Sequence, residues 1–168
     1  GADIDARDEF GNTALMMAAG EEHKEIVNTL LVRGANVHAT NKDGRTALMV
    51  AASWGDAEIV KLLLDNGAKV DARDQDGQTA LMMANLSVAK VLRRKANEEL
   101  LVAAQKGQVE RVKVLLDAGA KVDVTDKEGI TALMWAAWHG HTDVVKALLE
   151  AGVDIDPSHI AGKASLIE

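Results

Sequence analysis

The sequence predicts an all-α solenoid of stacked helix pairs from a repeated phrase, its spacing and the composition. The phrase Gly-x-Thr-Ala-Leu-Met occurs four times, beginning at Gly11, Gly44, Gly77 and Gly129. The first three copies are 33 residues apart, a period typical of proteins built from repeated helix pairs. The chain is 48% hydrophobic but only 2% aromatic, which suits thin layers of small aliphatic side chains rather than one thick core.

Each repeated unit is predicted to hold two helices, and residues 41–72 show the pattern most fully. Thr46 can cap the first helix, because its hydroxyl can accept a hydrogen bond from an unpaired backbone N–H. Gly55 permits a tight turn, and Gly67 permits the left-handed conformation that ends a helix. Between these glycines, apolar residues recur at helical spacing, namely Ile59, Val60, Leu62 and Leu63.

The complete phrase resembles the ankyrin repeat, and the resemblance covers essentially the whole chain. It implies an ankyrin-repeat solenoid of about five repeats, with β-hairpin fingers between repeats and a protein-binding function. Where the family usually has Thr-Pro-Leu-His, this chain has Thr-Ala-Leu-Met. Ala47 therefore replaces a proline favoured in the first helical turn. Met49 replaces a histidine, and methionine fills the same space through dispersion contacts alone.

With this phrase as a ruler, the chain divides into successive repeats within one domain, residues 1–168. We expect a partial finger, five repeats and a final partial repeat or cap, at residues 1–7, 8–40, 41–73, 74–96, 97–125, 126–156 and 157–168. Both ends fall within the phrase, which predicts a fragment of a longer protein. The alternative is that natural ragged ends serve as caps.

The third repeat is predicted to be truncated. Its second helix follows its first through Asn85 with no room for the usual turn, and Asn97 is expected to cap the first helix of the next repeat. The finger between these two repeats is expected to be missing. Because the stability of a solenoid sums repeat and nearest-neighbour terms, residues 1–84 and 97–156 are expected to form two stability units.

Composition and charge favour some classes of partner over others. A formal net charge of −7 argues against nucleic acid, since phosphate binding needs a basic face. The basic cluster Arg93-Arg94-Lys95 is read as the solvated end of a helix, with a docking site for an acidic partner as the alternative. The sequence contains no 18-residue apolar run and no leader pattern, so it predicts neither membrane insertion nor secretion by a leader. The absence of cysteine is compatible with a cytoplasmic location, and delivery to another compartment stays open.

The sequence contains no recognisable catalytic motif, so we expect a non-enzymatic protein without a cofactor or metal site. His139 and His141 alone do not form a closed zinc site. The segment Asp74-x-Asp76-Gly77 resembles the middle of a calcium loop, but Ala72 and Met83 stand where carboxylate ligands would be needed. It is better read as turn chemistry at a finger tip.

The rare aromatic residues mark the expected binding surface. Trp54 and Trp138 lie at the ends of first helices, which the ankyrin family turns toward its concave face, and such rings can anchor a partner. The alternative is that each ring covers its own helix turn, and Trp135 is read as core packing. The predicted surface of concave face and finger tips comprises Phe10, Lys42, Arg45, Trp54, Lys127, Ile130, Trp138 and His139.

A protein–protein interaction module is therefore the predicted function. Two alternatives stay open: a regulatory or targeting segment of a larger multidomain protein, or a self-associating structural spacer. The first repeat has no predecessor to cover its face, on which the sequence places Leu15, Met17 and Ile26. We expect either a homodimer through uncapped terminal repeats or native sequence, missing here, that covers this face.

Overall fold

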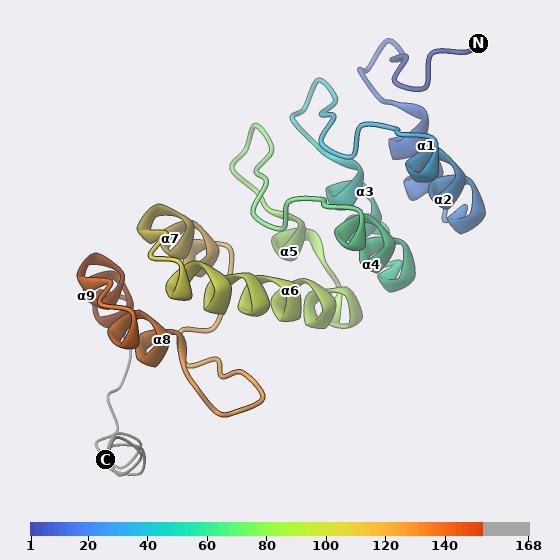
Figure 1. Ribbon diagram of the computed structural model, residues 1–168. Coiled ribbons are helices and arrows are strands. Elements are labelled where there is room, and N and C mark those ends of the chain that lie inside the picture. Colours follow the sequence, from blue (N-terminus) through green and yellow to red (C-terminus); the bar gives the residue numbers. More distant parts are fainter. Residues whose placement is uncertain (153–168) are drawn as a thin grey trace.

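Residues 1–152 form a row of helix pairs linked by projecting loops in the computed structural model (Figure 1). The end of the expected fifth repeat and the partial repeat at 157–168 lie outside these described residues. The predicted all-α class is confirmed. In chain order the helices are α1 (Ala14–Gly20), α2 (Lys24–Val32), α3 (Ala47–Trp54), α4 (Ala57–Asp65), α5 (Ala80–Met83), α6 (Leu86–Gln105), α7 (Val109–Asp117), α8 (Ala132–Trp138) and α9 (Thr142–Glu150).

The helices begin and end where the repeated phrase supplies the right chemistry. The hydroxyls of Thr13, Thr46 and Thr131 accept hydrogen bonds from backbone N–H groups at the starts of α1, α3 and α8. Such caps satisfy donors that have no partner within the helix. After α4, Gly67 adopts a left-handed φ of 89°, which ends the helix at little steric cost because glycine has no Cβ.

The loops before α1, α3 and α5 stack on one another through backbone hydrogen bonds. The Lys42 N–H donates to Phe10 O at 2.9 Å, and the Gln75 N–H donates to Asp43 O at 3.0 Å. No strand occurs within residues 1–152, so the β-hairpin form of the fingers stays a prediction. Three of these loops close at their bases with a single antiparallel bridge, between Arg7 and Thr13, Thr40 and Thr46, and Thr125 and Thr131.

The truncated third repeat takes a form that differs from the prediction. Its first helix, α5, has four residues. Asn85 then caps α6, whose 20 residues run without a break through the expected boundary at 96/97. Asn97 therefore lies inside a helix, and its predicted role as an N-cap is wrong. Its side-chain oxygen instead accepts the Lys121 N–H at 2.7 Å.

One long helix thus serves two repeats. Figure 1 shows one end of α6 beside α4 and its other end beside α7 and α8, and α6 contacts α5 as well. Leu92, Ala96 and Leu100 are completely buried along its length. The core therefore continues through the shortened repeat.

A missing glycine explains why α6 continues. Asn85 and Asp56 cap corresponding helices, and counting from these caps places Ala96 where α4 has Gly67. Alanine cannot adopt the left-handed conformation of Gly67 without a steric penalty, so the chain has no stop signal here. Ala96 is instead a buried helical residue, and a helix-to-helix turn becomes a continuous helix.

Ala96→Gly is expected to lower the free energy of unfolding by about 1 to 2 kcal/mol. Glycine costs about 1 kcal/mol in a helix interior, and the lost methyl group adds a burial term of about 0.8 kcal/mol. Urea denaturation followed by circular dichroism measures the change. Ala6→Gly, in an exposed loop, is the matched control and should stay within about 0.5 kcal/mol of the parent. Equal effects of the two substitutions would refute this explanation of α6.

Candidate partner-binding surface

Two predicted surface residues meet at neighbouring loop tips. Phe10 is 62% exposed, and its carbonyl accepts the backbone N–H of exposed Lys42. The Asp8 carboxylate shapes the Phe10 loop by accepting the N–H groups of Phe10 at 2.9 Å and Asn12 at 2.7 Å. Desolvation alone would raise the pKa of Asp8, but these hydrogen bonds outweigh it and hold the pKa below its ordinary value. Phe10 and Lys42 therefore form a fixed finger-tip pair.

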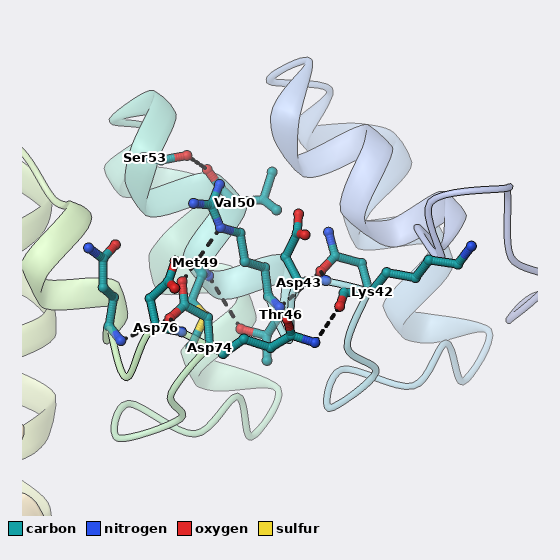
Figure 2. Close-up of polar contacts among 12 residues, drawn as sticks. Lys42, Asp43, Thr46, Met49, Val50, Ser53, Asp74 and Asp76 are labelled. Carbon is teal, nitrogen blue, oxygen red and sulfur yellow. Dashed lines mark hydrogen bonds and ion pairs between the residues drawn. The ribbon is translucent and has the colours of Figure 1, made fainter.

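Arg45 is partly engaged within the protein. Its Nε lies 3.6 Å from Oδ2 of Asp74, whose side chain is only 1% exposed. The other Asp74 oxygen accepts the N–H groups of Asp76 and Gln78. Figure 2 shows Asp74 and Asp76 on the loop before α5, close to the start of α3 where Thr46 caps the helix. Arg45 thus braces two neighbouring loops, which is a role that the sequence did not reveal.

Trp54 lies away from the loop tips, at the far end of α3. Its indole edge packs near Gly20 at the end of α1, since a methyl group on Gly20 would lie 3.7 Å from Trp54 Nε1. The same methyl group would lie 3.2 Å from a Val50 methyl carbon. Trp54 nevertheless remains 66% exposed. The ring therefore covers little of its surroundings and stays available to solvent.

The second half of the chain carries a cluster of aromatic rings at the end of α8. The rings of Trp135 and Trp138 stack with their centroids 5.5 Å apart and an interplanar angle of 7°. The His139 ring lies 5.6 Å from Trp135 and 6.2 Å from Trp138. His141 stacks on His139 at 6.0 Å. We call Trp135, Trp138, His139 and His141 the aromatic cluster.

Hydrogen bonds fix three of the four rings. Trp135 Nε1–H donates to Asp126 Oδ2 at 2.8 Å, and a His139 ring nitrogen lies 3.0 Å from the Trp135 carbonyl oxygen. A ring nitrogen of His141 lies 3.0 Å from Gln105 O. Trp138 is the fourth ring of the cluster, and it is 73% exposed. The cluster thus presents one open indole on a fixed base.

Trp135 is only partly a core residue, contrary to the sequence interpretation. It is partly buried, and one of its faces supports Trp138. The repeat register contained the signal, because counting from the capping threonines aligns Trp135 with Met17 and Val50. Met17 is 56% exposed, so this position lies at the surface in another repeat.

Lys127 and Ile130 lie on the loop between α7 and α8. Lys127 is exposed and Ile130 is partly buried. The Ile130 N–H donates to Asp126 at 2.8 Å, which ties this loop to the base of the aromatic cluster. Figure 1 shows the loops before α1, α3 and α5 projecting to one side, whereas this loop projects to another. The structure therefore brings Lys127 and Ile130 near the cluster and separates them from the finger-tip pair.

Shortening of the third repeat exposes apolar side chains that the sequence interpretation missed. Met82 is 62% exposed, whereas Met49, at the same position one repeat earlier, is 1% exposed. Leu86 is 72% exposed at the start of α6. In a regular stack a separate first helix of the next repeat would lie beside α5, whereas here α5 is followed directly by α6.

A charged clamp joins the two halves of the chain. Arg111 Nη1 lies 2.8 Å from Asp71 Oδ2, and Nη2 pairs with Glu99. Partial desolvation alone would lower the pKa of Arg111, but its hydrogen bonds and charge interactions with Asp71 and Glu99 outweigh this and raise it. Counting from the helix caps places Arg111 where α4 has Ile59, which is fully buried. A shallow groove of about 400 Å³ lies beside this clamp.

The comparisons identify the class of protein that this fold defines. A family model of ankyrin repeats matches three overlapping segments, residues 1–74, 21–100 and 89–159. The chain belongs to the ankyrin-repeat family, whose members generally act as protein–protein interaction modules. No curated protein matched the chain. Within residues 1–152, no helix combines the length and the apolar character needed to cross a bilayer.

Proposed function

We propose that this chain is a non-enzymatic module that binds a protein partner through its exposed tryptophans. The observation that supports this proposal is the exposure of Trp54 at 66% and Trp138 at 73% in a chain with only four aromatic Phe, Trp or Tyr residues. Rigid indoles bury a large area on binding at low entropic cost, and they dominate many protein interfaces. A stable helix end does not need either ring.

The geometry supports a proposal of two separate contact regions. One is Trp54 at the end of α3, and the other is the aromatic cluster with the neighbouring loop residues Lys127 and Ile130. The finger-tip pair adds contacts on the side to which the first three loops project (Figure 1). The net charge of −7 favours a protein partner over nucleic acid, and the lack of cysteine is compatible with a cytoplasmic location.

Affinity capture with identification by mass spectrometry tests the proposal. The baits are the parent chain and a Trp54→Ala, Trp138→Ala double variant whose helical content matches that of the parent by circular dichroism. We expect a protein that the parent enriches and the double variant loses. If both baits enrich the same proteins to the same extent, the tryptophans do not bind the partner.

Self-association is a second candidate, supported by the first helix pair. Met17 is 56% exposed and Ile26 is 50% exposed, while Leu15, expected on the same open face, is 1% exposed and belongs to the core. In sedimentation equilibrium we expect a concentration-dependent dimer that Ile26→Glu dissociates, because a buried charge opposes the contact. Lys61→Glu, on an exposed position of α4, is the control. A parent chain that stays monomeric at high concentration would exclude this function.

A further inference from the structure

We propose that the aromatic cluster binds an arginine side chain of the partner, with the guanidinium stacked on the open face of Trp138. This inference rests on the proposed function and adds the chemistry of the recognised group.

The fold does not require a large side chain at the position of Trp138. Counting from the capping threonines aligns it with Gly20 and Ser53, so two other repeats form the same helix end with a very small side chain. Its ring is nevertheless 73% exposed, which gives up most of the stabilisation that burial of an indole would provide. A large ring at a position that needs none indicates a role outside folding.

The support beneath Trp138 is rigid. Trp135 is partly buried and its indole N–H is held by Asp126, so its ring plane is fixed. Trp138 lies almost parallel to that plane, and His139 lies beside both rings. A platform that is ordered before binding loses little conformational entropy when a ligand stacks on it.

The ring faces of the cluster and the net charge of the chain favour a cation over an anion. Indole faces carry negative potential and attract guanidinium and ammonium groups. The loop beside the stack carries a carboxylate, Asp126, which accepts the hydrogen bond from Trp135 Nε1–H, and an ammonium group, Lys127. The chain as a whole carries a net charge of −7, which adds long-range attraction for a basic segment.

Arginine suits this platform better than lysine does. The guanidinium is planar and less strongly hydrated than an ammonium group, so it stacks on an exposed ring at a lower desolvation cost. A partner segment with an arginine flanked by small residues would approach the end of α8 without steric conflict, because Trp138 projects into solvent.

Peptide titration followed by NMR of the three indole N–H signals tests the inference. The probes are Gly/Ser peptides with arginine, lysine, citrulline or leucine at the same positions; citrulline keeps the shape of arginine without its charge. We expect the arginine peptide to shift the Trp135 and Trp138 signals and to bind at least about threefold more tightly than the citrulline peptide. Lysine should fall between them, and the Trp54 signal should stay unchanged.

Substitutions assign the effect to the cluster. Trp138→Ala should abolish the shift of the Trp135 signal, Trp138→Phe should retain weakened binding, and Lys61→Ala, at an exposed position of α4, should bind like the parent. Equal affinity for arginine and citrulline peptides, or unchanged binding by a folded Trp138→Ala variant, would overturn the inference. The proposed function is judged separately by protein capture: a partner that needs Trp138 but is not displaced by the arginine peptide supports the function and contradicts the arginine assignment.

Discussion

Trp138→Ala is expected to weaken binding of a purified partner by about 2 to 4 kcal/mol, the usual cost of truncating an interface tryptophan that becomes buried. Trp54→Ala is expected to cost a similar amount if the partner reaches the end of α3. Isothermal titration calorimetry measures both affinities. The free energy of unfolding should change little, because both rings are mostly exposed.

The matched controls lie on the outer faces of second helices. Lys61 and Lys146 are exposed, and replacing either with alanine should change binding by no more than about 0.5 kcal/mol. If the tryptophan variants fold normally and bind as well as these controls, the assignment of the binding surface is wrong. The opposite faces and the loops must then be examined.

Arg111→Ala is expected to lower the free energy of unfolding by about 2 kcal/mol. It leaves the carboxylate of Asp71, with a side chain 14% exposed, without its cationic partner. Breaking a fully buried ion pair costs about 3 to 5 kcal/mol. The smaller value applies because the Arg111 side chain is 32% exposed, so water screens part of the interaction. Urea denaturation measures the loss.

Two variants test the origin of this effect. Arg111→Met combined with Asp71→Asn and Glu99→Gln should recover much of the lost stability, because neither carboxylate is then left without its cationic partner. Lys113→Ala removes an exposed lysine that pairs with Glu110 at 3.6 Å on the same helix, and it should cost at most about 0.5 kcal/mol. Identical unfolding midpoints for Arg111→Ala and Lys113→Ala would show that the clamp contributes nothing.

The clamp and α6 also change the expected pattern of cooperativity. The sequence predicts two stability units on either side of the shortened repeat. The structure joins them through a 20-residue helix and through the ion pairs of Arg111 with Asp71 and Glu99. We therefore expect hydrogen exchange to show strong protection through the middle of α6, and Arg111→Ala to lower that protection.

The repeated phrase predicted much of the fold because its signals are local. The hydroxyl of Thr46 and the left-handed conformation of Gly67 act within one helical turn, so they mark helix ends in the sequence itself. The continuity of α6 was also encoded locally, by alanine at position 96. It was missed because Asn97 offered a plausible cap, and a potential cap does not end a helix that has no stop signal.

The candidate site was harder to predict because it depends on the relative placement of distant segments. Asp71 and Arg111 are far apart in the chain and meet only because α6 positions α7 against the loop before α5. The stacking of Trp138 on Trp135 depends on a hydrogen bond to Asp126, outside the helix. The sequence showed that these residues are aromatic or charged. Their spacing did not show which of them lie on the same face of the protein.

A hydrogen-exchange footprint of the partner complex tests the central claim most directly. Binding should protect backbone amides around Trp54, around residues 135–141, or in both regions, and the same protection should be absent for the folded double variant Trp54→Ala, Trp138→Ala. Protection confined to the outer faces of α2, α4, α7 and α9, and retained by the double variant, would contradict binding through the exposed tryptophans.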